Sequence, residues 1–456
     1  MNRYQRVLTI GRGIALAALC MAGSSEAQRL DPRFGGDGRV SLGFTPVAGS
    51  ETDHAVVACA NGSRLLVSGL ASGAWRVVTA ALTESGALDV SFSDDGKETF
   101  NPQRTPRIGD APAIGACLAD GSPVLAYSAV LTATESALVV IKLDPATGLP
   151  DPDFGDLGSV ELDLATGDAQ EWPRGLNVVN GELLLGIELQ RADGQFGAVV
   201  RLDSAGNVLA QRVLDRPEDS AWAPGSVTAI VPFDDRWMLF GMSSTRSPDL
   251  RNAVFVALNS DFGTLSQPRA ADRIFESTGR GRLVAPGVMA VPALRRWGDG
   301  VLVPSLLVLH ESGELRTLEF RTPGPQPIAG QATSVANWYE SPEVIPLPDG
   351  RVALLGTLSS LQGGDGRGLF VGLAVLGDTP DGLHADGRFG DQGWWQVDAG
   401  ATGCPRPDFA LARTTLWSGR LTFAGRVLAQ PCGASPGDDY WVGRMQALPL
   451  FANGFE

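Results

Sequence analysis

Histidines are the first residues in this chain whose chemistry could support a metal site. His54, His310 and His384 lie far apart in the sequence and fall in connections at different ends of the predicted strands. A zinc site needs three or four ligands that converge on one point, so we do not expect these side chains to form one. The sequence also contains no Ser-His-Asp grouping, phosphate-binding glycine loop or spaced Cys/His motif. We therefore assign no catalytic residue, no cofactor and no metal ligand.

Acidic turns are a second candidate for metal chemistry. Asp37, Asp94, Asp95, Asp386 and Asp391 stand in glycine-rich turns. Calcium needs six or more converging oxygen atoms, and no loop that ends in a bidentate glutamate follows any of these residues. Aspartate and glycine are also the residues that tight turns require. We interpret these aspartates as turn residues.

Four cysteines follow the N-terminal segment, and they fall into two pairs. Cys404 precedes the first strand of the last repeat unit, and Cys432 follows its second strand, so the two meet at one end of a hairpin. In an oxidising compartment we expect a Cys404–Cys432 disulfide. Cys59 and Cys117 occupy equivalent first strands of neighbouring units, where a small thiol fits a core. We expect these two to be free.

Aromatic residues give the clearest indication of a ligand site. Trp172, Trp222, Trp338 and Tyr339 each stand shortly before a predicted first strand. If first strands line a central channel, these side chains could ring its mouth and hold a sugar or a peptide. The alternative is that the tryptophans wedge between neighbouring sheets. We name the four as candidate ligand-rim residues.

The elements that must position these residues come from an internal repeat. A turn with a phenylalanine four residues after a leucine or its equivalent recurs with a period of about 60 residues, or a multiple of it. Its copies surround Phe34 (Leu30-Asp31-Pro32-Arg33-Phe34-Gly35-Gly36-Asp37-Gly38), Phe92, Phe154 and Phe389.

A second repeated feature is a tight turn that precedes a short apolar strand. Asn-Gly and Asp-Gly accept positive φ at little cost and close hairpins. The seven copies begin at Asn61, Asp120, Asn180, Asp234, Asp299, Asp349 and Ser418. A third strand follows in each unit. In all units but the last a fourth strand comes next, such as Ser159 to Leu162, Arg273 to Phe275 or Trp394 to Val397.

Four short antiparallel strands per unit predict an all-β, seven-bladed β-propeller. The strand near Val40 to Leu42 precedes the first unit, and the seventh unit has no fourth strand of its own. We therefore expect the N-terminal strand to complete the last blade and close the ring, which removes an open sheet edge. A solenoid of stacked sheets is the alternative architecture.

The Leu-Asp-x-x-Phe-Gly-x-x-Gly turn, combined with Asp-Gly hairpins at this period, resembles the delta-60 repeat family of bacterial β-propellers. The resemblance covers nearly all of residues 28–447, although the fourth and fifth units have largely lost the turn. It implies the propeller fold and no particular activity. The ending Leu450 to Glu456 is similar to a Phe-x-x-Gly-Phe-Glu terminus of various exported bacterial proteins, where it could be a sorting tag or an apolar tail.

The N-terminal residues predict export. Arg3, Arg6 and Arg12 precede an apolar run from Ile14 to Ala22, and Ser25-Glu26-Ala27 offers a cleavage site, as in a secretory signal peptide. We expect residues 1–27 to be this peptide, 28–447 to be one propeller domain and 448–456 to be a tail. The mature chain should be monomeric and without a transmembrane segment, in the periplasm, at the cell surface or outside the cell.

Composition restricts the partners. The chain of 456 residues has a formal net charge of −15, which disfavours nucleic acid. With no catalytic grouping, our first hypothesis is a non-catalytic binding or scaffold module for a protein or glycan, because loops on a rigid frame are common binding surfaces. The alternatives are a hydrolase or lyase that acts on a polysaccharide with acidic residues at the channel mouth, and a structural cell-surface component.

Overall fold

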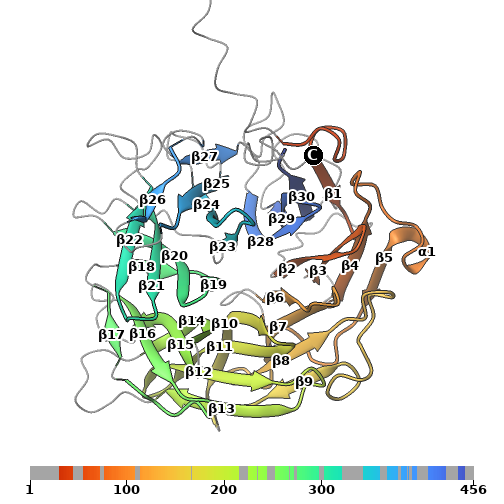
Figure 1. Cartoon of the computed structure of the whole chain (residues 1–456). Coiled ribbons are helices and arrows are strands. Elements are labelled where there is room, and N and C mark those ends of the chain that lie inside the picture. The colour runs from red at the N-terminus through yellow and green to blue at the C-terminus, as the bar shows by residue number, and fades with distance from the viewer. Residues whose placement is uncertain are drawn as a thin grey trace, which may run out of the picture.

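The computed structural model is a ring of seven antiparallel sheets around a central axis, which confirms the predicted seven-bladed propeller (Figure 1). The only helix in the described residues is the four-residue turn α1 (Ser93–Gly96). The structure describes residues 30–446 apart from 45–54, 72–75, 108–112, 166, 215–223, 234, 244–251, 267, 272–274, 297–301, 321–341, 360–366, 378–381, 388, 390–392, 398–408 and 428–439.

Each blade is a sheet whose strands follow one another outward from the axis. Blade 1 contains β2 (Ala55–Asn61), β3 (Arg64–Ala71), β4 (Arg76–Leu82) and β5 (Lys97–Phe100). Blade 2 contains β6 (Ile114–Cys117), β7 (Pro123–Val130), β8 (Ser136–Lys142) and β9 (Ser159–Leu162). Blade 3 contains β10 (Gln170–Val179), β11 (Glu182–Arg191), β12 (Gly194–Leu202) and β13 (Val208–Leu214). Blade 4 contains β14 (Pro224–Phe233), β15 (Arg236–Ser243), β16 (Ala253–Leu258) and β17 (Arg269–Ala270).

The remaining blades vary this plan. Blade 5 has a first strand in two pieces, β18 (Phe275–Thr278) and β19 (Arg282–Ala285), then β20 (Val288–Arg296), β21 (Leu302–His310) and β22 (Leu315–Glu319). Blade 6 contains β23 (Glu343–Pro346), β24 (Arg351–Ser359) and β25 (Arg367–Val375), with an outer strand in two pieces, β26 (His384–Ala385) and β27 (Trp394–Val397). Blade 7 contains β28 (Phe409–Trp417), β29 (Arg420–Val427), β30 (Tyr440–Arg444) and, as its outer strand, β1 (Arg39–Leu42).

The two ends of the described chain close the ring, as predicted. Strand β1 pairs antiparallel with β30, from Arg39 opposite Gly443 to Leu42 opposite Tyr440. In Figure 1, β1 at the red end of the colour scale lies beside β30 at the blue end. Blade 7 therefore cannot be completed without the N-terminal strand.

A buried carboxylate fastens this closure. Asp31 is 3% exposed and lies between Arg420 and Arg444, with Nη2 of Arg444 at 2.9 Å from its Oδ2. The backbone N–H of Asp31 also donates to the carbonyl oxygen of Arg444 at 2.8 Å. Side chain and backbone thus join the same two segments.

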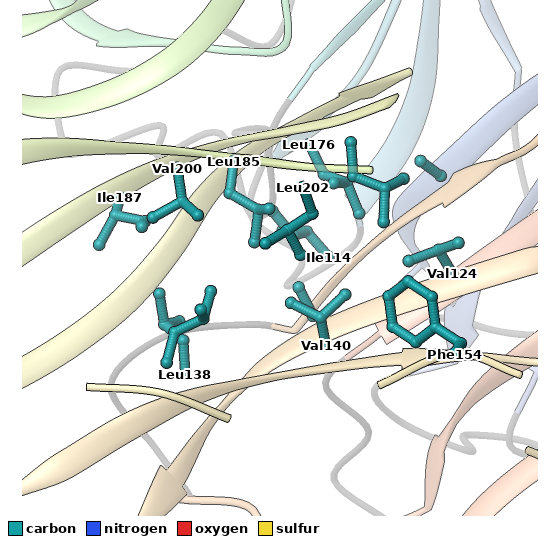
Figure 2. Close-up of a cluster of buried hydrophobic side chains, with 14 of the residues drawn as sticks. Ile114, Val124, Leu138, Val140, Phe154, Leu176, Leu185, Ile187, Val200 and Leu202 are labelled. Carbon is teal, nitrogen blue, oxygen red and sulfur yellow. The ribbon is translucent and has the colours of Figure 1, made fainter. Parts of the chain in front are cut away.

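The core consists of the layers between blades. Along β11 successive residues face opposite neighbours, so Leu183 and Leu185 pack toward blade 2 while Leu184 packs toward blade 4. Both faces of a blade are buried, which explains why its middle strands are continuous apolar runs. Figure 2 shows the layer between blades 2 and 3, including Ile114, Val124, Leu138, Val140, Phe154, Leu176, Leu185, Ile187, Val200 and Leu202.

The repeated turn is held by its aspartate. In blade 1, Oδ1 of Asp89 accepts the backbone N–H of Ser91 at 3.0 Å, and the same carboxylate pairs with Arg64. In blade 2, Asp151 pairs with Lys142 at 2.7 Å, and this hydrogen bond lowers the pKa of Asp151 below its usual value. The aspartate therefore fixes the turn to the sheet. Of the acids interpreted as turn residues, Asp37 and Asp95 accept the backbone N–H groups of Arg39 and Lys97, two residues ahead in the same turns, at 3.1 and 2.8 Å, while Asp391 lies outside the described residues.

The repeated phenylalanine is an inter-blade wedge. Phe154 is fully buried, and a Cβ added at Gly206 in the next blade would lie 3.3 Å from its ring. Gly206 has φ of +87°, so glycine at this turn satisfies both the backbone and the close contact. The same contact joins Phe34 to Gly86, Phe92 to Gly148 and Phe154 to Gly206.

Two strand assignments made from the sequence are wrong. The predicted fourth strand at 273–275 is instead β17 at Arg269–Ala270, and Phe275 begins the first strand of blade 5. Residues 299–300, predicted to close the hairpin of strands one and two in the fifth unit, separate its second and third strands. The first hairpin of this blade turns at Pro286-Gly287, where Gly287 has φ of +65°.

Candidate functional site

The inner strands of neighbouring blades lie close together at the axis, and this overturns one prediction. Cys59 on β2 and Cys117 on β6 form a disulfide with a Cα–Cα distance of 5.4 Å, although both were expected to be free. The expectation treated the blades as separate layers, whereas their inner edges converge on the channel. Equivalent positions on adjacent first strands are therefore near enough for a covalent bond.

Several predicted features lie outside the described residues. They are the signal peptide 1–27, His54, Trp222, Trp338, Tyr339, Cys404, Cys432 and the tail 448–456. Each stays a prediction.

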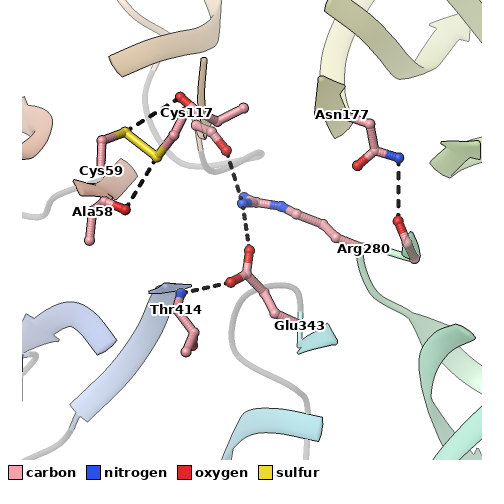
Figure 3. Close-up of polar contacts among 10 residues, drawn as sticks. Ala58, Cys59, Cys117, Asn177, Arg280, Glu343 and Thr414 are labelled. Carbon is pink, nitrogen blue, oxygen red and sulfur yellow. Dashed lines mark hydrogen bonds and ion pairs between the residues drawn. A yellow bond between two sulfur atoms is a disulfide. The ribbon is translucent and has the colours of Figure 1, made fainter. Parts of the chain in front are cut away.

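A buried ion pair joins blades 5 and 6 at the central channel, and its arginine reaches across the channel to blade 2 (Figure 3). Nη1 of Arg280, from blade 5, lies 3.1 Å from Oε1 of Glu343 in blade 6 and donates to the carbonyl oxygen of Gly115 in blade 2 at 3.3 Å. Oε2 of Glu343 accepts the backbone N–H of Thr414 in blade 7 at 2.7 Å. Arg280 is 5% exposed and Glu343 is fully buried. Side chains therefore fill the channel at this level, and we call the Arg280–Glu343 pair the cross-channel tie.

Two glycines allow Arg280 to reach the axis. A Cβ on Gly279 would lie 2.1 Å from the carbonyl oxygen of Pro342, and one on Gly281 would lie 2.6 Å from Val291. The backbone N–H of Arg280 donates to the Pro342 carbonyl at 3.0 Å. The chain between β18 and β19 thus presses against its neighbours on both sides of Arg280.

A hollow of about 490 Å³ lies beside this tie, at the end of the channel where the first strands finish. Two of its lining residues adjoin this contact in sequence, since Ala116 follows Gly115 and Arg282 follows Gly281. Its apolar wall includes Leu176, Val178, Val179, Val231, Pro232, Leu283 and Pro346. We call this space the axial hollow. Its volume is typical of small-ligand sites, which span roughly 300–1,000 Å³.

The chemistry of the axial hollow is mostly apolar. Leu283 is 38% exposed, which is unusual for a leucine beside a buried channel. Asn177 is held in place because its Nδ2 donates to the carbonyl oxygens of Ile230 at 2.7 Å and Gly281 at 3.3 Å. Arg282 is the one charged residue among the described lining residues, which include no carboxylate.

Trp172 is the one described member of the predicted aromatic rim, and it lies toward the opposite mouth. It was predicted to precede the first strand of its blade, but it lies within that strand, near the start of β10. The guanidinium of Arg174 lies 5.5 Å from its ring, and Arg174 pairs with Glu188 at 2.8 Å. The buried indole Nε1–H of Trp172 has no hydrogen-bond partner in the described part of the chain. This side chain is partly buried between strands and keeps one unused donor.

Glu171, beside Trp172, faces the layer between blades 2 and 3. Its Oε1 accepts the backbone N–H groups of Leu164 at 2.6 Å and Ala165 at 3.1 Å. Burial raises the pKa of Glu171 to about 8. The side chain is fully buried, so it anchors the connection between the two blades and does not meet a ligand.

The two described histidines lie at the connections between the third and fourth strands of their blades, as predicted. His310 ends β21 and His384 begins β26. Among the residues with defined positions, no three His, Cys, Asp or Glu side chains gather where they could hold a metal ion. In the same residues, no helix is long and apolar enough to cross a membrane.

The fold and the axial hollow together define a seven-bladed propeller with a blocked channel. Comparison with protein-family models and with curated proteins gave no match. Solved structures with a similar fold include the polysaccharide lyase Uly1 (12% identity, 88% of this chain and 91% of that chain, TM-score 0.48). They also include an α-L-arabinanase of Penicillium chrysogenum complexed with arabinobiose (12%, 90% and 97%, 0.42). Similarities this weak do not indicate what this chain binds.

Sequence reasoning did not find the cross-channel tie. The Gly279-Arg280-Gly281 sequence is visible, but its partners Glu343, Gly115 and Thr414 come from three other blades. The axial hollow was also missed, because valine, proline and leucine at strand ends look like ordinary core residues.

Proposed function

We propose that this protein is a non-catalytic binding module whose protein ligand inserts an apolar side chain into the axial hollow. One observation supports this above all: a recess of about 490 Å³, walled by apolar side chains, lies beside a channel that the cross-channel tie fills. Exposed apolar walls lose contact with water when a ligand side chain fills them, and this favours binding.

The lining favours a peptide over a sugar and binding over catalysis. Sugar sites commonly use an aromatic ring, and no aromatic side chain is among the described lining residues. Glycoside hydrolysis needs two carboxyl groups about 5–10 Å apart, and the described lining has none.

Export and family membership belong to the same proposal. The Cys59–Cys117 disulfide is expected in an oxidising compartment, which supports an exported chain. Membership of the delta-60 family is supported by the repeated turn, because its aspartate pairs within its own blade and its phenylalanine packs against the next blade at successive positions.

The test is a thermal-unfolding screen of residues 28–456 with two libraries, acetylated tetrapeptides with free carboxyl ends and neutral oligosaccharides. A ligand that binds only the folded state raises the midpoint, by about 2.7 kcal/mol in stability at a hundredfold excess over its Kd. We expect peptides with bulky apolar side chains to raise it. Leu283→Arg should abolish the rise, whereas Leu265→Arg, at a leucine 56% exposed outside the hollow, should preserve it.

A rise with oligosaccharides that survives Leu283→Arg but disappears in Trp172→Ala would contradict this proposal and assign the ligand to the opposite mouth. The unused indole donor of Trp172 is the observation that justifies this arm. No rise with either library would favour the structural alternative.

A further inference from the structure

Some blades lack the repeated turn, and this changes how they pack against the next blade. In blades 3 and 5, the outer strand directly follows the third-strand turn, as shown by the pairing of Val208 with Leu202 and of Leu315 with Leu309. No wedge phenylalanine is therefore inserted there. Each of these blades therefore has no ring of its own at the place where it meets its next neighbour.

The space between blades 3 and 4 is filled from the opposite side. Phe262 in blade 4 has φ of +62°, in a turn where blades 1 and 3 have the glycines Gly86 and Gly206. Its ring is fully buried and packs on Leu184 and Val199 of blade 3. A phenylalanine thus replaces the glycine where the neighbouring phenylalanine is absent.

Between blades 4 and 5 an exposed arginine on the outer strand lies over the edge of the interface. Arg269 on β17 lies with its guanidinium 5.3 Å from the ring centroid of Phe255. A Cβ added at Gly313 in the turn of blade 5 would lie 3.4 Å from Nη1 of Arg269. The long side chain therefore covers this interface.

Between blades 5 and 6 the equivalent place is hollow. Leu309 pairs with Leu315 as Leu82 pairs with Leu88 in blade 1, so Val308 corresponds to Ala81, which packs in the same cluster as Phe92. A cavity of about 420 Å³ lies against Val308. Blade 5 contributes Val288, Val308, His310 and Glu311 to its wall, and blade 6 contributes Leu376 and Leu383.

We propose that this cavity, the wedge niche, is a binding site for a phenylalanine side chain from an extended segment of a partner protein. The occupant is indicated by the chain itself, since the corresponding places next to blades 7, 1, 2 and 6 hold Phe34, Phe92, Phe154 and Phe389, each at most 2% exposed. A dry cavity of about 150 Å³ already accommodates a benzene ring. The wedge niche is larger, so the ring can enter with part of its backbone.

The entrance of the wedge niche carries negative charge. Glu311 is exposed, and its carboxylate has no ion pair within the described part of the chain, although Nη2 of Arg236 donates to its backbone carbonyl oxygen at 3.3 Å. Its Oε2 lies near Gly287, where an added Cβ would be 2.5 Å away. A basic residue next to the phenylalanine would therefore meet an opposite charge. The chain's own Arg33-Phe34 and Arg388-Phe389 have this order.

The probe is a fluorescein-labelled, amidated hexapeptide Asp-Pro-Arg-Phe-Gly-Gly, which reproduces residues 31–36, and the readout is fluorescence anisotropy with the intact chain. We expect saturable binding, weakened roughly tenfold or more when alanine replaces the phenylalanine of the probe. Leu383→Trp should block the wedge niche to a similar extent, while Leu265→Trp should bind the probe like the wild type.

Glu311→Lys provides a second variant, at an exposed position that does not endanger folding, and should weaken binding of the arginine-containing probe. Equal binding of the alanine peptide, unchanged binding in both Leu383→Trp and Glu311→Lys, or no saturation at millimolar protein would overturn the proposal. Binding of phenylalaninamide as tightly as the hexapeptide would also overturn it, in favour of a small aromatic ligand. Leu283→Arg should retain binding, which separates this site from the axial hollow.

Discussion

At the scale of single residues, the cross-channel tie explains how the channel is blocked. A buried ion pair contributes little net stability compared with apolar packing, but the removal of one partner leaves an uncompensated buried charge. Arg280 and Glu343 also fix the inner strands of four blades relative to one another. Arg280 donates to the carbonyl oxygen of Gly115 in blade 2, and Glu343 accepts the backbone N–H of Thr414 in blade 7. We therefore attribute to the tie the shape of the channel and of the axial hollow beside it.

The first prediction concerns Glu343. Glu343→Ala removes the carboxylate that neutralises Arg280, so the free energy of unfolding should fall by about 3–5 kcal/mol. Glu161→Ala, which removes an exposed partner of Arg104, should cost less than about 1 kcal/mol. Urea denaturation of both variants measures the difference, and equal losses would show that the tie does not bear on folding.

The second prediction follows from the raised pKa of Glu171, about 8 in the folded chain. The pKa of the unfolded carboxyl is near its ordinary value of 4.5, while the folded one keeps its proton up to about pH 8. Stability should therefore fall as pH rises from about 4.5 to 8. Each pKa unit corresponds to about 1.4 kcal/mol. Glu171→Gln still accepts the N–H groups of Leu164 and Ala165 and should flatten this dependence.

Urea denaturation at pH 5, 6.5 and 8 checks this, since these values sample the interval that the two pKa values define. Asp153→Asn, at an exposed turn residue, serves as the control and should keep the wild-type slope. The same slope for Glu171→Gln would mean that the Glu171 carboxyl ionises normally when folded.

At the scale of elements, the repeated turn unites one blade internally and joins it to the next. Its aspartate ties the turn to its own sheet, as with Asp89 and Arg64, and its phenylalanine packs against a glycine of the following blade. Where the turn is lost, the interfaces differ. Phe262 fills the space between blades 3 and 4, Arg269 lies over the edge between blades 4 and 5, and the wedge niche remains between blades 5 and 6.

The third prediction concerns this wedge. Phe154→Ala should lower the free energy of unfolding by about 3–5 kcal/mol, because a buried aromatic ring is lost and a cavity remains. Phe196→Ala is the matched control, since Phe196 is partly exposed at a hairpin and stacks with Arg191 at 4.0 Å. A similar loss for both would contradict the wedge role.

The elements were largely predictable from the sequence because each repeat records local physics. Turn residues and apolar runs gave the seven blades and the closure by the N-terminal strand. The prediction of the first hairpin was wrong in blade 5. This hairpin turns at Pro286-Gly287, whereas the prediction placed the turn at the Asp-Gly pair of residues 299–300. The cysteine pairing failed for a different reason, since proximity at the axis depends on how blades converge and not on any local pattern.

The candidate site was less predictable than the fold. The tie joins residues from blades 2, 5, 6 and 7, and no spacing within one unit indicates such a meeting. The sequence does show that the fifth unit lacks the repeated turn and its phenylalanine. It does not show that blade 6 has no side chain to fill the place of that phenylalanine, so the wedge niche was not predicted.

At the scale of the whole molecule, stability depends on closure of the ring by two distant segments. Asp31 contacts Arg420 and Arg444 across nearly the full length of the chain. The fourth prediction is that Asp31→Ala lowers the free energy of unfolding by about 3–5 kcal/mol, because two arginines lose a buried carboxylate. Hydrogen exchange in Tyr440–Arg444 should accelerate, since β1 pairs with this strand.

Asp151→Ala in blade 2 is the control for closure. It removes the equivalent turn aspartate and its pair with Lys142, but no ring-closing contact. It should leave exchange in β30 unchanged. Equal acceleration of β30 in both variants would show that Asp31 has no special part in closing the ring.

The most direct test of the central claim is to find where a bound peptide touches the protein. The tetrapeptide with the largest effect in the unfolding screen would carry a photoreactive benzophenone at its apolar side chain, and mass spectrometry would map the cross-linked residues. We predict adducts at Val178, Leu283 and Pro346, from blades 3, 5 and 6, and none in Leu283→Arg. Adducts near Trp172, or on outer strands, would contradict the assignment of the axial hollow as the ligand site.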